Sequence, residues 1–579
     1  MKKNVLALSI AAMIGGLGFA GAVSAEVIPG RGGAATWNGS ALTASTATDL
    51  VFSEGGVGHQ LLVPYYTAQD GNMTVLHVVN TDTANGKAVK VRFRGASNSD
   101  DVLDFQVFLS PQDVWTAAVS AGADGVAQIV TADNTCTVPR LVPGTPQSFI
   151  TTRVNPNSDK AEQTREGYVE IFNIADIPSI KDARWAVAPS TTPVNSPLYT
   201  LTKHKDGVAP CSAGGADWTK LEEIAIASYP DTAPGEAAAA AAGFNTPTGG
   251  LYGDWYIINV PKTTTFSGGA TALRAVDGTG SSARGNFVHF PQNDGTVTNV
   301  EHFTADPLFR VGSVNLNNVA TTVAALEAGN YDLPDFSTPY LVAGQYPTGL
   351  ASNGAPLQQA ATLTEALAVK SVTNQYATDA TISAKTDWVF SMPTRRYSVA
   401  ANYAILAEST NTKGYAHEDY RLFSVMPATV TTPWFRPRAS AAATGASNTT
   451  VDANGNICVS VDSQKFYDRE ETEKTAPATG SVFSPAKPGV GAKFALCGEV
   501  NVLAFKDAGV SVLGASSNIA RQTAADSLIY TNGWGVFGTN NGGAGLPILG
   551  ASFIKLTNPS AGTGFSGTYG ITWPHRYTK

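Results

Sequence analysis

Apolar and polar residues alternate most regularly between residues 61 and 117 of this 579-residue chain. Within residues 87–94 and 102–109 every second side chain is apolar, a period that predicts strands with one buried and one solvent-facing side. If residues 95–100 connect them, the two strands form a hairpin in which the following residues pair: Phe93 with Leu103, Val91 with Phe105, Val89 with Val107, and Arg92 with Asp104. The polar row of Lys90, Arg92 and Arg94 is predicted to face solvent or an acidic surface of a neighbouring subunit. An exposed cross-strand ion pair contributes only about 0.2–1 kcal/mol, so the apolar side carries the hairpin.

Upstream of this hairpin, residues 59–68 and 73–81 are two further β-rich runs, separated by Gln69-Asp70-Gly71-Asn72. Asp-Gly between such runs favours a two-residue primed turn, because glycine accepts a positive φ. The predicted pairing sets Tyr65 opposite Leu76. Pro64 has no N–H to donate, so we expect its strand at a sheet edge or beside a bulge.

The rest of the chain is mostly strand-like, with a few helical segments. Further strands are expected near residues 148–155, 167–177 and 254–260, and helices are expected near residues 217–229, 234–243, 319–331 and 356–370. A hairpin closed at Asn454-Gly455 is predicted for residues 449–462, and strands with Gly/Asn turns for the last 85 residues or so. No fixed-period repeat is present, which disfavours a propeller or solenoid. The predicted fold class is mainly β, with immunoglobulin-like antiparallel β-sandwich domains and a few short helical insertions.

The predicted domain layout begins with a signal peptide. Residues 1–25 carry two lysines, a short glycine-broken apolar run and Val-Ser-Ala before Glu26, which indicates Sec-dependent export rather than a membrane anchor. Residues 26–55 are predicted to be a flexible arm, with an edge-pairing strand as the less favoured alternative. Residues 56–310 form a β-sandwich domain with a disulfide and helix insertion at about 130–250, and residues 311–579 form one or more further β-rich domains.

Composition agrees with an exported surface protein. Charged residues make up 15% of the chain, against roughly 25% in an ordinary soluble protein. Removing Lys2 and Lys3 with the signal peptide changes the formal charge from −8 to −10. Such an acidic balance argues against a nucleic-acid partner.

Four cysteines remain, and an exported chain meets an oxidising environment, so disulfides are expected. Three connectivities are possible, and the sequential one, Cys136–Cys211 with Cys458–Cys497, is favoured because each pair then closes a loop-rich segment. No pair has Cys-x-x-Cys spacing and no histidine stands at finger spacing, which disfavours zinc.

Oxygen-rich turns suggest calcium as a possible ligand and no other cofactor. The candidate ligands are Asp100, Asp101, Asp452, Asn454 and Asn456. The second run is not an EF-hand, since Gly455 is misplaced and Ser463 stands where the bidentate glutamate belongs. Turn formation alone is the simpler interpretation of these residues.

No catalytic motif was found, and the chain is predicted not to be an enzyme. The run Gly564–Thr568 fails the Gly-x-Ser-x-Gly pattern in its last position, and the histidine beside two carboxylates at 417–421 is interpreted as a polar loop. Five tryptophans are expected to pack in cores or between domains more than to line a sugar groove: Trp255, Trp388, Trp434, Trp534 and Trp573.

Three stretches carry a resemblance to known proteins: residues 63–115, DWVFSMPTRRY at 387–397 and TWPHRY at 572–577. They resemble a group of large exported surface proteins of Gram-negative bacteria. The resemblance implies a surface layer or another cell-envelope assembly, located outside the cell. It covers about a quarter of the chain and transfers no site residue.

Three functions follow as hypotheses. The first is a non-enzymatic secreted protein that self-associates into a surface layer, with lipopolysaccharide or another envelope component as a further partner. The second is a secreted carbohydrate-active or sugar-binding β-sandwich protein. The third is an outer-membrane β-barrel, disfavoured by 32 prolines, by the expected disulfide loops and by a final lysine instead of an aromatic residue.

Overall fold

The computed structural model describes residues 26–33, 37–151, 154–155, 158–227, 229–289, 314–316, 319–321, 355–401, 422–424, 433–436, 448–452, 454–475, 494–506, 511–516, 521–524, 529–558, 560–562 and 567–579. Within these residues the chain is mainly β, with several largely antiparallel sheets and few helices. The predicted signal peptide at 1–25 and the histidine run at 417–421 lie outside them. No helix of the described part has both the length and the apolar character needed to cross a membrane.

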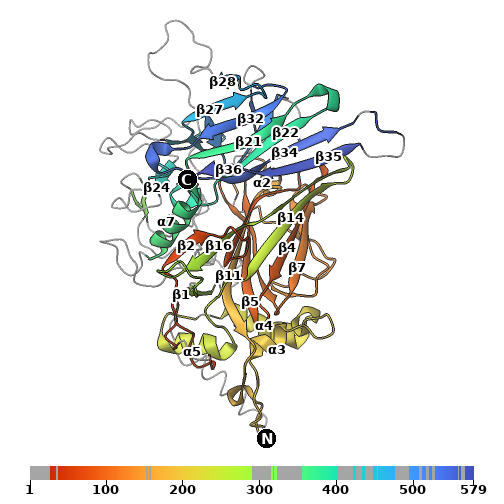
Figure 1. The fold of residues 1–579 in the computed structure, drawn as a ribbon. Helices are drawn as coiled ribbons and strands as arrows, with labels where there is room; N and C mark the ends of the chain where they lie inside the picture. Colours follow the sequence, from red (N-terminus) through yellow and green to blue (C-terminus); the bar gives the residue numbers. More distant parts are fainter. Residues whose placement is uncertain are drawn as a thin grey trace.

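The amino-terminal unit contains two large sheets (Figure 1). The seven-stranded sheet has the order β2 (Asp49–Phe52), β16 (Thr271–Val276), β3 (Gln60–Thr67), β11 (Glu166–Pro178), β5 (Asn85–Gly95), β6 (Asp101–Leu109) and β9 (Cys136–Val138). The six-stranded sheet has the order β10 (Gln147–Ser148), β8 (Ala127–Val130), β7 (Val114–Ala121), β4 (Met73–Asn80), β14 (Leu251–Asn259) and β15 (Thr264–Gly269). The two sheets share one apolar core, to which Phe93 and Phe105 contribute from the first and Trp115 and Trp255 from the second.

The β5–β6 hairpin has the predicted register. Phe93 pairs with Leu103, Val91 with Phe105, and Arg92 with Asp104. The prediction is confirmed because strict alternation and a single turn-rich break leave one pairing that puts every apolar side chain on the same face.

The predicted hairpin between β3 and β4 is wrong. Asp70 and Gly71 do have the positive φ values of a primed turn, 53° and 79°, but β3 pairs with β11 and β16 while β4 pairs with β14 and β7. The chain therefore crosses from one sheet to the other at this turn. The physical reason is burial: every residue of β3 is buried, as suits a sheet covered on both faces, whereas burial along β4 alternates.

Pro64 lies inside a sheet, opposite a register shift of β11 between Gly167 and Val169. The prediction of a bulge beside this proline is thus confirmed, and its alternative, an edge strand, is not. The sequence also predicts a strand near residues 148–155. Among the described residues there, only the two-residue β10 is a strand.

Helices and the amino-terminal segment cover the second face of the seven-stranded sheet. They are α3 (Pro197–Thr202), α4 (Gly215–Ile226), α5 (Ala233–Ala242) and α7 (Ala355–Leu367), and the short α2 (Lys160–Thr164) precedes β11. The predicted helices near 217–229, 234–243 and 356–370 are confirmed as α4, α5 and α7. The predicted helix 319–331 lies outside the described residues except for 319–321, which form β19.

Residues 26–55 follow the edge-pairing alternative, not the flexible arm, wherever they are described. β1 (Glu26–Ile28) pairs with β17 (Phe287–His289), and β2 adds to the edge of the seven-stranded sheet beside β16. Ile28 and Leu42 are completely buried. This segment is therefore part of the fold.

The carboxy-terminal unit has two five-stranded sheets. One has the order β28 (Glu473–Thr475), β27 (Ser463–Tyr467), β32 (Asn532–Gly538), β21 (Ser371–Ala377) and β36 (Arg576–Thr578). The other has the order β31 (Arg521–Ala524), β30 (Val500–Phe505), β22 (Lys385–Ser391), β34 (Leu549–Thr557) and β35 (Thr568–Pro574), with β31 parallel to β30. A smaller sheet consists of β25 (Thr449–Val451), β26 (Ile457–Ser460) and β29 (Ala495–Cys497), and the predicted β25–β26 hairpin is confirmed.

Short two-stranded ribbons complete the described elements: β12 (Lys181–Asp182) with β13 (Val194–Asn195), β18 (Val314–Leu316) with β19 (Val319–Thr321), β20 (Ala368–Val369) with β33 (Leu546–Pro547), and β23 (Val399–Ala401) with β24 (Leu422–Ser424).

The two units pack through a continuous apolar core. Phe553 of β34 contacts the rings of Tyr65, Trp255 and Phe266, which all belong to the amino-terminal unit. The sheet of β22 and β34 therefore lies between the amino-terminal unit and the sheet of β27 and β32, which forms the far end of the molecule (Figure 1).

Candidate functional site

The predicted solvent-facing row of Lys90, Arg92 and Arg94 is buried, with no measurable exposure of any of the three residues. Lys90 forms an ion pair with Asp104, and its pKa is lowered by burial, an effect that the neighbouring Asp104 partly offsets. The prediction is wrong because alternation distinguishes the two faces of a strand without showing what covers the polar one. Here helices, the amino-terminal segment and the carboxy-terminal unit cover it.

A cluster of opposite charges joins the two units. Arg396, in the short 3₁₀ turn Arg395–Tyr397 that follows β22, donates from Nη2 to both carboxylate oxygens of Glu170 at 2.7 and 3.0 Å. Arg94 donates from Nε to the same carboxylate at 3.4 Å. All three side chains are buried, so Glu170 on β11 holds one arginine from each unit.

A second buried ion pair lies beside the first. Arg395 Nε lies 2.7 Å from Glu499 Oε2, and Arg395 Nη1 donates to the carbonyl of Ile457 at 2.7 Å. Burial raises the pKa of Glu499, and the nearby Arg395 and Arg396 oppose that rise. These charges neutralise one another inside the protein, so the cluster stabilises the junction and offers no accessible acid or base. The Thr-Arg-Arg-Tyr run was a sequence signal for it, because two adjacent arginines follow an apolar strand.

Glu166 is a third junction carboxylate, and its hydrogen-bond partners are neutral. Tyr65 Oη donates to Oε1 at 2.6 Å, and the backbone N–H of Ser516, from the other unit, donates to Oε2 at 3.0 Å. Complete burial raises the pKa of Glu166 to about 7, although both hydrogen bonds favour the ionised form. This side chain therefore titrates near neutral pH.

The two turns predicted to bind calcium lie against each other. Asn98 Nδ2 donates to the carbonyl of Gly455 at 2.9 Å, and the N–H of Ile457 donates back to Asn98 Oδ1 at 3.0 Å. Ser97 Oγ donates to Asn456 Oδ1, which connects the turns again. Sequence reasoning found both turns but not that they meet.

Within the second turn, the Asp452 carboxylate accepts hydrogen bonds from the backbone N–H groups of Asn454 and Asn456 at 2.9 and 2.8 Å. These are the bonds of an Asx turn. In the first turn Asp100 and Asp101 are buried, and Asp101 lies 4.0 Å from Arg94. Asp452 is thus accounted for as a turn former and Asp101 as a neighbour of Arg94, and calcium binding stays a prediction. Asp452 also lies near the sulfurs of Cys458 and Cys497, but those sulfurs are bonded to each other and offer no thiolate.

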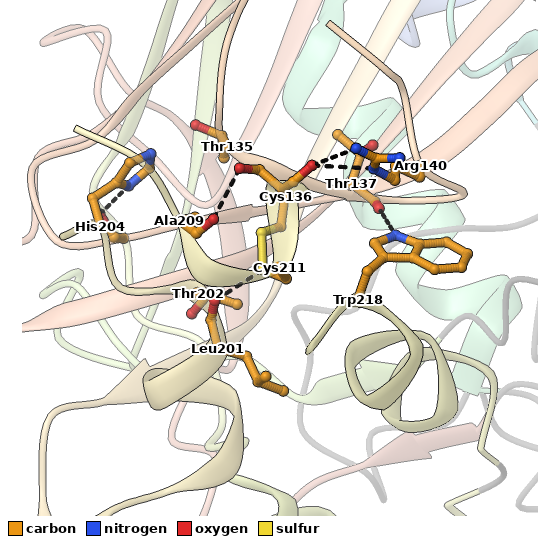
Figure 2. The surroundings of a disulfide bond; sticks show 12 residues. Thr135, Cys136, Thr137, Arg140, Leu201, Thr202, His204, Ala209, Cys211 and Trp218 are labelled. Carbon is orange, nitrogen blue, oxygen red and sulfur yellow. Dashed lines mark hydrogen bonds between the residues drawn. A yellow bond between two sulfur atoms is a disulfide. The ribbon is translucent and has the colours of Figure 1, made fainter. Parts of the chain in front are cut away.

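The sequential disulfide pairing is confirmed. Cys136 is joined to Cys211 and Cys458 to Cys497, and no free cysteine is present among the four. Figure 2 shows the first bond, which ties β9 to the helical insertion. Around it, Trp218 of α4 donates to the carbonyl of Thr137 at 3.1 Å, and Arg140 donates to the carbonyl of Ser212. The bond thus anchors the helices to the edge of the seven-stranded sheet.

The tryptophans divide into two groups. Trp255, Trp388 and Trp434 are buried, as the core interpretation predicts. Trp534 and Trp573 are 40% and 41% exposed, so neither of these two lies in a core.

The outer face of the six-stranded sheet has an unusual composition for an exposed surface. Burial alternates along β4, β7, β8 and β14 and at the start of β15, which places the following residues outward on that sheet: Met73, Val75, His77, Val79, Val114, Thr116, Ala118, Ser120, Gln128, Val130, Tyr252, Asp254, Tyr256, Ile258, Thr265 and Ser267. Most are apolar, and Val114 and Tyr256 are 44% and 37% exposed. An antiparallel sheet with one solvated face usually carries polar residues there.

We call these outward residues the apolar face. It contains few charged side chains. Among the outward-facing residues of β4, β7, β8, β14 and β15, only His77 and Asp254 belong to the acidic and basic types, and they are register partners. His77 also contacts the ring of Tyr256 edge-on and lies 3.0 Å from Thr116 Oγ1. Sequence reasoning missed the face, although Met73, Val75 and Val79 at the outward positions of one strand were a visible signal.

Comparisons with known proteins add no relative: no family model, no curated protein and no solved structure matches this chain.

Proposed function

We propose that this chain is an exported, non-enzymatic structural protein that assembles with copies of itself at the cell surface, as in a surface layer. The observation that carries the proposal is the apolar face of the six-stranded sheet. Exposed apolar patches larger than a few hundred Å² mark interaction surfaces in soluble proteins. The leader-like residues 1–25 and the two disulfides support an oxidising location outside the cell.

The dimensions of the face suit a protein partner. The three strands that carry most of it, β7, β4 and β14, have eight or nine residues, which at about 3.4 Å each span about 30 Å, and three strands about 4.8 Å apart span about 14 Å. The product, about 400 Å², is half of the roughly 800 Å² per partner of a standard protein interface, so this face would be the apolar centre of a contact that extends beyond it. Two such faces pack as sheets do, about 10 Å apart.

A second copy is the partner that the charge distribution favours. In a two-fold contact each residue lies near the same region of the other copy, so a face with several like charges would repel itself. Here one acidic residue, Asp254, stands beside one histidine, His77, and most of the other outward residues are apolar. Further contacts at other surfaces, with lipopolysaccharide or another envelope component as an anchor, would extend the dimer into an assembly.

The same proposal includes the immunoglobulin-like character of the domains. Two antiparallel sheets with a shared core support it. The absence of enzymatic activity is also part of the proposal, and it is supported by the use of buried arginines and glutamates as mutual ion-pair partners.

Oligomeric state tests the proposal directly. Val75 and Tyr256 are register partners at the centre of the face, so Val75→Glu with Tyr256→Glu places two carboxylates in each copy where a dimer would bury them. The matched control is Val260→Glu, because Val260 is 73% exposed and follows the end of β14. Light scattering after size exclusion, and electron microscopy with and without calcium, measure assembly.

We expect the wild type and Val260→Glu to associate and the double variant to stay monomeric with unchanged thermal stability. Dispersed wild-type monomers in every condition, or a double variant that assembles as the wild type does, would contradict the proposal.

A further inference from the structure

A second exposed feature lies at the far end of the molecule, on the outer face of the sheet that contains β27, β32 and β21 (Figure 1). The rings of Tyr467 and Trp534 are stacked there, with centroids 4.3 Å apart and planes 14° from parallel. The two residues are register partners on neighbouring strands. One stacked aromatic pair therefore stands on a sheet face at the surface.

The strand order shows which side of the indole Tyr467 leaves uncovered. Tyr467 approaches Trp534 from β27, and Gln375, the register partner of Trp534 on its other side, lies on β21. Since Tyr467 covers one ring face, the second ring face is directed toward Gln375. Trp534 is 40% exposed and Gln375 is exposed as well.

Charged and amide groups surround the stack. Tyr467 Oη donates to Glu473 Oε2 at 3.1 Å, and Lys465 Nζ lies 3.0 Å from Glu473 Oε1. The register continues the row from Glu473 through Tyr467 and Trp534 to Gln375. An aromatic surface thus has hydrogen-bond donors and acceptors on both sides.

We infer that this row binds a saccharide, with a pyranose ring packed on the exposed part of the Trp534 indole. The C–H groups on one side of a pyranose are apolar and match an aromatic face, while its hydroxyls both donate and accept hydrogen bonds. The Gln375 amide does the same, because it carries two donors and one acceptor oxygen. Tyr467 holds the indole in place, which lowers the entropy lost on binding.

The size of the apolar area separates a sugar from a protein partner. Two aromatic side chains contribute about 150–250 Å² each when fully buried, and here one ring face of each is already covered by the other. This is far below the roughly 800 Å² per partner of a standard protein interface, but it suits one or two sugar rings. The inference stands on a different sheet and on different residues from the proposed self-association.

Affinity electrophoresis tests the inference on the full oxidised chain. Native gels containing dextran, laminarin, xylan or the polysaccharide released from lipopolysaccharide serve as the probes, and retardation measures binding. We expect the wild type to be retarded by at least one probe, and Trp534→Ala to lose about tenfold or more in affinity. Gln375→Ala should weaken binding less, since it removes only hydrogen bonds.

Trp573→Ala is the matched control, because Trp573 is 41% exposed on β35 of the other sheet. It should bind as the wild type does, and all variants should keep the wild-type melting temperature. A wild type that no probe retards, or equal loss in Trp534→Ala and Trp573→Ala, would overturn the inference. If Trp534→Ala changes oligomeric state instead, the stack is a protein contact and the inference also fails. The Val75→Glu, Tyr256→Glu variant should still bind, which separates this test from that of self-association.

Discussion

Glu170 should be the most sensitive single carboxylate at the junction between the two units. Its buried side chain accepts from Arg396 at 2.7 and 3.0 Å and from Arg94 at 3.4 Å. Replacing Glu170 with Gln keeps the shape but removes the charge that both guanidinium groups face. Two cations then remain buried in the same region with one carboxylate fewer.

The expected loss follows from the geometry. Opposite charges about 4 Å apart interact by about 4 kcal/mol at the effective dielectric constant of about 20 that describes protein sites. Removing one partner of a buried pair costs about 3–5 kcal/mol, and two arginines share Glu170, which favours the upper end. Typical domains unfold with about 5–15 kcal/mol. We therefore expect Glu170→Gln to remove a third or more of the stability.

Urea unfolding followed by fluorescence, with the disulfides intact, measures this loss. With a slope of about 3 kcal/mol per molar urea, the midpoint of Glu170→Gln should fall by about 1–1.5 M. Glu473→Gln is the control, because Glu473 also contacts a cation, Lys465, but the pair is exposed; its midpoint should stay near that of the wild type. Adding Arg396→Met to Glu170→Gln should recover part of the loss, since one unpaired buried cation is removed. A midpoint of Glu170→Gln equal to that of Glu473→Gln would refute the role assigned to the cluster.

Two further predictions concern pH and the disulfides. Glu166 has a pKa of about 7 in the folded protein against 4.5 for the free group. Its contribution to the free energy of unfolding is therefore fully present below about pH 4.5 and is lost as the pH rises through about 7. The loss amounts to up to about 3 kcal/mol. In Glu166→Gln the urea midpoint should fall less between pH 5 and pH 8 than in the wild type, and parallel curves would contradict the assignment. Removing either disulfide by paired Cys→Ser substitution should lower the free energy of unfolding by about 4–5 kcal/mol. The two losses should differ by only about 0.6 kcal/mol, because the entropy of loop closure grows with the logarithm of the sequence separation, which is 75 residues for one bond and 39 for the other. Unfolding of the two variants measures this, and a variant as stable as the wild type would show that its bond does not constrain the unfolded chain.

The amino-acid sequence by itself determined the local structure. The β5–β6 register followed from alternation and one turn, because a shift by one residue would expose Phe93 and Phe105. The helix α5 begins after a Thr232 cap and ends at Gly243 with φ 113°, which are both local signals. The sequential disulfides also followed from the order of the chain and the expected compartment.

Tertiary structure alone decided what lies on each face. The pattern around Asp70 and Gly71 predicted a turn correctly, but the pairing of β3 depended on β11 and β16, which are about 100 and 200 residues away. Arg94 could not be recognised as buried, because its partner Glu170 and the neighbouring Arg396 come from distant parts of the chain. A period of two shows that the faces of a strand differ. Whether the polar face meets water or an opposite charge depends on long-range packing, which the alternation within one strand does not reveal.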